Sequence, residues 1–171
     1  MESTYGLKAI VTRHFTVTGF LVAKNKILLH WHSKVKAWLP PGGHISENED
    51  PVQAVIREIL EETGMHAEVM PVRPFLPITY PFQVMAPFTI MVEDINDPIG
   101  GYHQHIDLIY FCRPLDLTQT IGPEWIWVSR SDIANNRPVC MEGAPNVKPP
   151  DDVCILALEA MKTLRRAHRS T

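Results

Sequence analysis

The length and composition of the chain predict a single globular domain. Of its 171 residues, 45% are apolar and 20% are charged, which is enough apolar surface for a core and too little charge for a disordered chain. The formal net charge of −3 argues against a nucleic-acid-binding protein, whose surface is normally basic. We therefore expect one domain over residues 1–171 and no nucleic-acid partner.

The sequence gives no sign of membrane attachment or secretion. No apolar run approaches the roughly 20 residues needed to cross a bilayer. The first four residues lack the basic start and apolar core of a signal peptide. Cys112, Cys140 and Cys154 are widely spaced, which argues against a disulfide framework or a zinc ribbon and favours packing in the core. We expect a cytoplasmic protein with no membrane partner.

The first elements predicted along the chain are a hairpin and a glycine-containing loop. Residues 15–22 and 27–32 are rich in β-branched and aromatic residues, which predicts two strands joined by a tight turn. The Pro-Pro-Gly-Gly segment at 40–43 places two stiff residues before two permissive ones. This order predicts a loop with unusual backbone geometry.

A helix is predicted after that loop. Asp50 suits the N-cap, Pro51 suits the first helical position, and Gln53 completes a capping box. Gly64 is expected to end the helix. Apolar side chains at three- and four-residue spacing predict one buried face. The residues of this face are Val52, Val55, Ile56, Ile59 and Thr63.

The rest of the chain predicts four more strands, a short helical turn and a last helix. The strands are expected at 66–72, 88–92, 102–111 and 125–128, and the turn at 131–134. The proline-containing segments 72–88 and 137–150 are expected to be loops. The last helix begins at Asp151 or Asp152, and its predicted buried residues are Val153, Leu156, Ala157, Ala160, Met161 and Leu164.

Three glutamates share one face of the first predicted helix. Glu58, Glu61 and Glu62 stand at i, i+3 and i+4, so at about 100° per residue they occupy one arc. Arg57 is placed to reach Glu61 and to pair with Glu49, but one guanidinium does not satisfy four carboxylates. A divalent metal would, and Mg²⁺ or Mn²⁺ suits oxygen ligands. The alternative is a solvated acidic face.

The spacing of these residues resembles the Nudix box. The box consists of a glycine, five residues, a glutamate, seven residues, Arg-Glu, an aliphatic residue, any residue, Glu-Glu, any residue, a glycine and an aliphatic residue. This chain fills the fixed positions with Gly43, Glu49, Arg57, Glu58, Ile59, Glu61, Glu62, Gly64 and Met65. Average residue frequencies put the chance of such a match on the order of 10⁻⁷ or less. The sequence is thus similar to Nudix hydrolases.

The resemblance implies a fold and an activity. The fold would be α/β, with a mixed β-sheet sandwiched between α-helices. The activity would be metal-dependent hydrolysis of a diphosphate bond in a nucleoside diphosphate linked to another moiety, such as a nucleoside triphosphate or a nucleotide sugar. A hydrolase of a non-nucleotide diphosphate and a non-catalytic nucleotide-binding module are the alternatives. Family members are often homodimers, so a homodimer is a further expectation.

The resemblance also assigns roles to the box residues. Glu58, Glu61 and Glu62 are expected to hold the Mg²⁺ or Mn²⁺, with the carbonyl group of Gly42 as a further ligand. The metal would neutralise phosphate oxygens and lower the pKa of the attacking water. Glu58 is the first choice of general base, and an acid from a later loop is the alternative.

Three further box residues are expected to support this site. Gly43, like Gly42, would let the backbone approach the metal and the phosphate without obstruction by a Cβ atom. Arg57, counted with the catalytic residues, would pair with Glu49 and fix the loop to the helix. The alternative for this pair is a surface contact worth under about 1 kcal/mol.

Side chains outside the box are candidates to line the site. His103, His105 and Asp107 alternate along a predicted strand and therefore share one face. They are expected to contact substrate phosphate or metal-bound water, with a zinc site or solvated histidines as the alternatives. His44 follows the two glycines and is expected near the phosphates, with surface exposure as its alternative.

The late strand supplies the last candidates. Glu124 precedes Trp127 in a pattern similar to the Glu-x-x-Trp strand of many Nudix proteins, so it is expected to add an acid near the metal. Four aromatic side chains are candidates to stack on a base, with core packing as the alternative. They are Trp31, Phe82, Tyr102 and Trp127.

Overall fold

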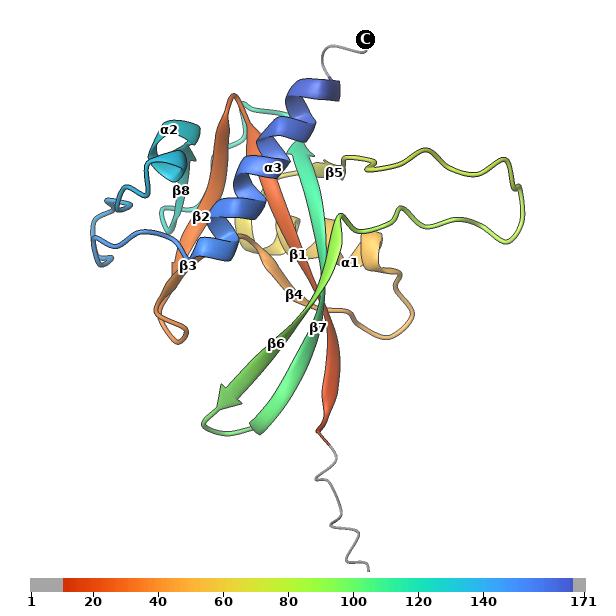
Figure 1. Ribbon diagram of the computed structural model, residues 1–171, viewed down its shortest axis with the longest axis horizontal. Helices are drawn as coiled ribbons and strands as arrows, with labels where there is room; N and C mark the ends of the chain where they lie inside the picture. Colours follow the sequence, from red (N-terminus) through yellow and green to blue (C-terminus); the bar gives the residue numbers. More distant parts are fainter. Residues whose placement is uncertain (1–10, 168–171) are drawn as a thin grey trace, which may run out of the picture.

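Two long parallel strands form the centre of the molecule, β1 (Arg13–Ala23) and β7 (Gly101–Pro114). The computed structural model describes residues 11–167 (Figure 1). The expectations for the first four residues, and for the outer ends of the domain 1–171, lie outside this range. Among residues 11–167, none of the helices combines the length and the apolar character needed to cross a membrane.

The other strands are arranged around this central pair. On one side, β7 pairs antiparallel with β5 (Ala67–Val69) and β6 (Thr89–Asp97). On the other, β1 pairs antiparallel with β2 (Lys26–His32) and β4 (Gly42–His44). The outer strands β3 (Ala37–Leu39) and β8 (Trp125–Ser129) both pair with β2. The sheet is therefore mixed.

The helices α1 (Pro51–Thr63) and α3 (Asp151–Ala167) pack on opposite faces of this sheet, and α2 (Arg130–Ala134) follows β8. Side chains alternate along a strand. Val17 and Leu21 of β1 accordingly belong to the core under α1, whereas Phe20 and Val22 belong to the core under α3. Figure 1 shows α3 running across the sheet. This is the expected α/β architecture, with the sheet between helices.

The first helix is confirmed in detail. The Asp50 side chain accepts hydrogen bonds from the backbone amides of Val52 and Gln53, and the Gln53 side chain accepts from the Asp50 amide. Gly64 ends the helix with a left-handed φ of 73°. Val55, Ile59 and Thr63 are buried, and Val52 and Ile56 are half-buried beside them. The expected stripe thus faces β1.

The hairpin turn, the segment 72–88, the segment 137–150 and the last helix are also as expected. All six apolar residues predicted to face the core in α3 are buried. Tight turns between antiparallel strands often require positive φ, and both turn residues, Lys24 and Asn25, adopt it.

Four features of the strands differ from the expectations. Gly42 and Gly43 lie in β4 rather than in a loop, and β3 was not expected at all. The strand predicted at 66–72 covers only Ala67–Val69, because Pro71 has no amide hydrogen to continue the pairing with β7. The strand β6 runs beyond 92 to Asp97, because backbone pairing with β7 continues through a polar segment.

One expectation about cysteines was also wrong. Cys112 and Cys154 are buried in the core, but Cys140 is exposed and donates to Asn146 Oδ1 at 3.0 Å. It lies in the long segment before α3, where the chain runs over the surface.

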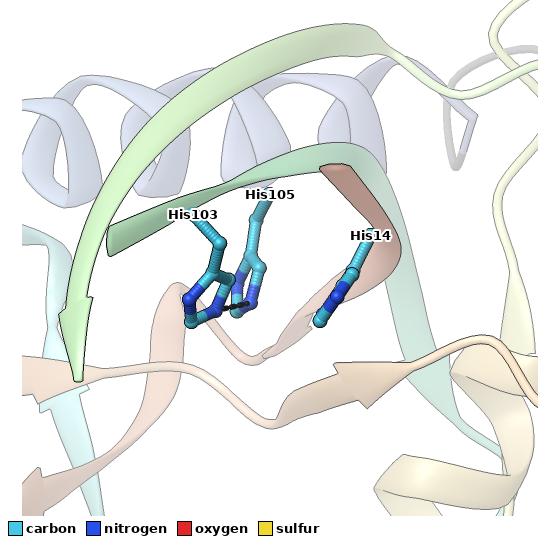
Figure 2. Close-up of side chains that lie close together, drawn as sticks. All are labelled: His14, His103 and His105. Atoms are coloured by element: carbon cyan, nitrogen blue, oxygen red, sulfur yellow. Dashed lines mark hydrogen bonds between the residues drawn. The ribbon is translucent and has the colours of Figure 1, made fainter. Parts of the chain in front are cut away.

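The parallel register of β1 and β7 brings distant polar residues together on the face opposite α1. His14 is the direct partner of His105, and Thr16 is the partner of Asp107. Figure 2 shows the rings of His14, His103 and His105 extending from the two strands to the same side.

Candidate active site

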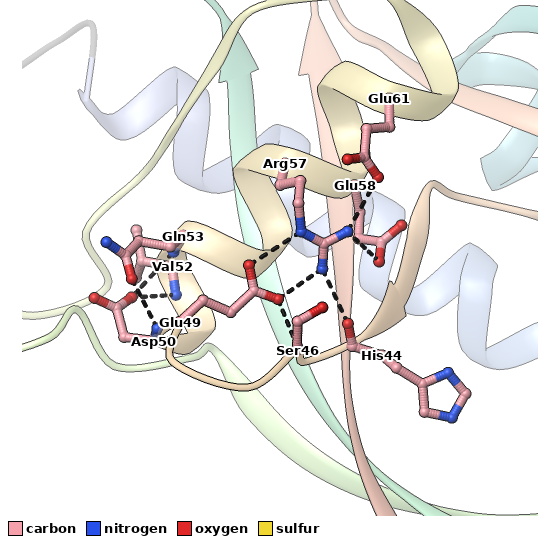
Figure 3. A network of polar contacts seen from close by, with 9 residues as sticks. All are labelled: His44, Ser46, Glu49, Asp50, Val52, Gln53, Arg57, Glu58 and Glu61. Atoms are coloured by element: carbon pink, nitrogen blue, oxygen red, sulfur yellow. Dashed lines mark hydrogen bonds and ion pairs between the residues drawn. The ribbon is translucent and has the colours of Figure 1, made fainter.

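The Arg57 guanidinium lies at the centre of the acidic face of α1 (Figure 3). Its Nε and Nη2 donate to the two carboxylate oxygens of Glu49 at 3.0 and 2.6 Å. Its Nη1 donates to Glu58 Oε1 at 2.8 Å and to Glu61 Oε2 at 3.1 Å. Nη2 also donates to the backbone carbonyl of His44 at 3.1 Å. One side chain thus joins the loop before α1, the helix itself and strand β4.

The fork-like contact with Arg57 has a clear electrostatic effect on Glu49. Hydrogen bonds from Arg57 lower the pKa of Glu49 to about 2, and the amide of Ser46, 2.6 Å from Glu49 Oε1, also favours the charged carboxylate. Bidentate contacts between arginine and a carboxylate combine charge with fixed geometry. Glu49 is therefore ionised at neutral pH and anchors the loop.

The Glu62 carboxylate has a different environment. It accepts a hydrogen bond from the backbone amide of Gly42 at 3.1 Å. Partial burial raises the pKa of Glu62 above its ordinary value, and the nearby charges of Glu58 and Glu61 act in the same direction. Arg57 supplies one positive charge to this group of acids. An excess of negative charge remains on the face, even though the guanidinium reaches three of the four carboxylates.

Strand β4 lies so close to its neighbours that only glycine fits at positions 42 and 43 unless a neighbour moves. A Cβ atom at position 43 would lie 2.5 Å from the Cδ atom of Glu58, and one at position 42 would overlap the carbonyl oxygen of Val17. Neither Gly42 nor Gly43 has positive φ. Because residue 43 has no side chain, the backbone of β4 lies directly against the Glu58 carboxylate.

This arrangement has the donor chemistry for a hard divalent cation. Glu58, Glu61 and Glu62 supply carboxylate oxygens from one helix face, and Gly42 lies within hydrogen-bond distance of Glu62. Magnesium and manganese favour oxygen ligands of this kind. The residues present thus fit a metal of that class.

Sequence reasoning missed Trp125 beside this helix. Its indole Nε1 donates to the backbone carbonyl of Glu62 at 2.9 Å, and its ring is buried. Trp127, two residues later, lies half-buried against the core under α1. Glu124 is exposed and lies against Gly122, where a Cβ atom would be 2.5 Å from its carboxylate. The alternation of β8 thus places Trp125 next to the acidic helix.

The predicted stacking aromatics are dispersed. Trp31 is half-buried against the core under α3 and contacts Trp38 edge to face, with ring centroids 5.6 Å apart. Tyr102 and Phe82 are exposed, and Phe82 lies in the long segment between β5 and β6. The structure therefore does not gather them around Arg57.

The histidine candidates come together, and a further one joins them. His44, His103 and His105 lie near His14, which sequence reasoning did not select. Asp107 shares their face but is buried and accepts hydrogen bonds from Thr16 at 3.0 Å and Thr18 at 2.6 Å. The alternation of His14 with these two threonines along β1 was the available signal.

A family model for the NUDIX domain matches residues 12–145, which includes the Arg57 network and all the candidate site residues. The chain belongs to the Nudix family. Among solved structures it is similar to a NUDIX-family hydrolase from Clostridium perfringens, at 31% identity and a TM-score of 0.66. The match covers 90% of this chain and 99% of that one. The expected Nudix fold is thus confirmed.

Two curated proteins also match this Nudix chain. "Nudix hydrolase 26, chloroplastic" from Arabidopsis thaliana is 53% identical over 109 residues, which cover 58% of this chain and 50% of that protein. An RNA pyrophosphohydrolase from Actinobacillus succinogenes is 27% identical over 119 residues, covering 65% and 59%. The chain therefore spans between half and three fifths of the length of these relatives.

Proposed function

We propose that this Nudix protein hydrolyses a diphosphate bond in a nucleoside diphosphate linked to another moiety, and that it requires Mg²⁺ or Mn²⁺. The observation that carries the proposal is the contact between β4 and the acidic face of α1. Gly43 lies directly against the Glu58 carboxylate, and the Gly42 amide donates to Glu62. Backbone and carboxylates lie side by side there, which supports a site for a cation and a phosphate group.

Glu58, Glu61 and Glu62, with the carbonyl group of Gly42, would hold the metal. When bound, such a metal neutralises phosphate oxygens and lowers the pKa of a bound water. Arg57 orients Glu58 and Glu61 through its Nη1 atom and holds the loop through Glu49. Glu58 is our first choice to take the proton from the attacking water, because it lies against the β4 backbone.

The proposal is tested by measuring phosphate and pyrophosphate release from a panel of nucleotides and nucleotide sugars, with Mg²⁺ and with EDTA. Glu61→Gln and Glu62→Gln should each lower turnover by at least about 100-fold, while circular dichroism shows that the fold is retained. Glu68→Gln is a matched control, because this glutamate pairs with Arg113 on the sheet instead. EDTA should abolish turnover and added Mg²⁺ should restore it.

The panel also separates the alternatives. Unchanged turnover in both glutamate variants would contradict the proposed mechanism. Thermal shifts with nucleotides but no product would identify a binding module without catalysis. Because one relative is named an RNA pyrophosphohydrolase, the panel includes an RNA with a 5′-triphosphate, although the net charge of −3 argues against nucleic acid.

A further inference from the structure

Four imidazole rings meet on the side of β4 that faces away from the acidic helix. Successive side chains of a strand point to opposite faces. In β4, Gly43 lies against Glu58, and the ring of the next residue, His44, points away from Arg57 (Figure 3). The His44 ring contacts His14 instead. The histidine cluster, defined as His14, His44, His103 and His105, is therefore separated from the glutamates by this strand.

Nitrogen atoms of three of the four rings lie close enough together to share one metal ion. Ligand nitrogens of His14, His103 and His105 all lie within 4.8 Å of one another. The Nε2 atoms of His103 and His105 are 3.2 Å apart, and His14 Nδ1 is 3.3 Å from His44 Nε2. Around a tetrahedral zinc with Zn–N bonds of about 2.0–2.1 Å, neighbouring nitrogens are about 3.3 Å apart. Two pairs already have this spacing.

The backbone orients one of these rings. His103 Nδ1 lies 3.1 Å from the carbonyl oxygen of Gly101. A carbonyl oxygen only accepts, so this nitrogen carries the hydrogen, and the lone pair is left on Nε2, which faces His105 (Figure 2). Histidines that bind metals commonly donate their other ring N–H to a carbonyl group in this way.

The strand register holds the cluster in place and excludes Asp107 from it. His14 and His105 are direct partners across the parallel β1–β7 ladder, and His103 lies two residues away on the same face. The carboxylate of Asp107 is occupied by the hydroxyl groups of Thr16 and Thr18. The third ligand is thus an imidazole of β1, rather than the aspartate of a His-x-His-x-Asp site.

We propose that His14, His103 and His105, with His44 as the fourth ligand, form a second metal site that takes a divalent transition metal such as Zn²⁺. Imidazole nitrogen suits zinc, copper and nickel, whereas Mg²⁺ prefers oxygen. Burial and the neighbouring histidines lower the pKa of His105, which favours the neutral ring that binds a metal. The two sites of this chain would therefore select different ions.

Cobalt is the probe for this site, because four-coordinate Co²⁺ with nitrogen ligands has visible absorption bands. The full chain without a polyhistidine tag is stripped with EDTA, dialysed, and titrated with Co²⁺ and then with Zn²⁺ in the presence of excess Mg²⁺. We expect one ion per chain, displacement of cobalt by zinc, and a higher melting temperature with zinc. His103→Gln and His105→Gln should each weaken binding by at least about tenfold.

Two controls locate the ion. His66→Gln, a change at an exposed histidine outside the cluster, should leave binding unchanged, and so should a Glu61→Gln/Glu62→Gln double variant. Circular dichroism of each stripped variant separates loss of the site from loss of the fold. The proposal is overturned if neither ion binds, if both cluster variants bind as well as the wild type, or if the glutamate variant loses the ion. None of these readouts requires turnover.

Discussion

The α-carbon of Gly43 lies so close to the Glu58 carboxylate that a methyl group at this position would be 2.5 Å from Glu58 Cδ. This relationship links a strand to the helix that carries the acidic face. The Glu58 carboxylate therefore packs directly against the backbone of Gly43. It also accepts a hydrogen bond from Arg57 Nη1 at 2.8 Å. Two features therefore set the position of Glu58. Position 43 has no Cβ atom to push the carboxylate away, and Arg57 Nη1 donates a hydrogen bond to it.

We expect Gly43→Ala to impair activity without unfolding the protein. The added methyl group meets the far end of a flexible glutamate, which moves aside and leaves its position in the site. A displacement of about 1 Å in a catalytic group lowers turnover by about 100-fold. Turnover assays and thermal melting of the purified variant measure the two effects.

The adjacent glycine serves as the matched comparison. In Gly42→Ala the methyl group overlaps the carbonyl oxygen of Val17, which is backbone and cannot rotate away. This variant should lose about 1–3 kcal/mol of unfolding free energy, as overpacked variants do. Equal stability of the two variants would contradict the distinction between them.

Trp125→Phe should destabilise the protein more than Trp127→Phe. The first change removes the indole N–H that donates to the Glu62 carbonyl at 2.9 Å and also leaves space in a buried site. The expected loss is about 1–3 kcal/mol, whereas the half-buried Trp127 should cost less. Urea denaturation followed by circular dichroism compares them, and a larger loss in Trp127→Phe would refute this ranking.

Elements that are specified by neighbouring residues in the chain, such as α1, could be predicted from the sequence. The capping box, the apolar spacing and the terminal glycine of α1 all lie within one short segment, and each is found as expected. The strand β4 was missed because its partner, β1, is separated from it by two other strands in the chain, and β3 was missed because it has only 3 residues. Gly42 and Gly43 have low strand propensity, and only their contacts with Val17 and Glu58 explain them.

The part of the candidate site that lies within one short segment of the chain was predictable as well. The four acids and Arg57 lie on one loop and one helix, so their spacing in the sequence brings them together in space. His14 joins the histidine cluster through the parallel register of β1 and β7, which pairs residues far apart in the chain. No local pattern encodes that register, and sequence reasoning therefore selected His44, His103 and His105 but not His14.

In the absence of metal, Glu62→Gln should stabilise the folded protein at neutral pH, although the same change is expected to lower turnover when metal is present. The pKa of Glu62 is raised in the folded protein, so ionisation of this group opposes folding once the pH exceeds that pKa. The neutral amide avoids this cost and still accepts from the Gly42 amide. We expect a gain below about 1 kcal/mol, because the side chain is only partly buried and solvent screens its charge.

The pH dependence distinguishes this effect from better packing. Below the ordinary glutamate pKa of 4.5 the carboxyl group is protonated in both the folded and the unfolded chain, and the advantage of glutamine should vanish. Denaturation in EDTA between pH 4 and pH 8 measures it. A gain that does not vary with pH would show that the charge is not its cause.

Arg57→Gln should have the opposite pH dependence. The pKa of Glu49 is lowered to about 2 in the folded protein by Arg57, so the ion pair contributes stability above the ordinary pKa of 4.5 and loses it as the pH falls toward 2. At pH 7 the variant should lose about 1–2 kcal/mol of unfolding free energy, since the pair is bidentate but lies near solvent.

The exposed pair of Arg113 and Glu68 provides the comparison for Arg57. Its Nε–Oε1 distance of 2.7 Å is as short as the contacts of Arg57, but both side chains are more than 40% exposed. Arg113→Gln should therefore cost less than about 0.5 kcal/mol at any pH. Titration by NMR should show the pKa of Glu49 rising from about 2 toward 4.5 in Arg57→Gln but not in Arg113→Gln. Equal losses of stability in Arg57→Gln and Arg113→Gln would contradict this prediction. They would mean that the donor–acceptor distance alone sets the strength of both ion pairs, and that Arg57 does not anchor the loop.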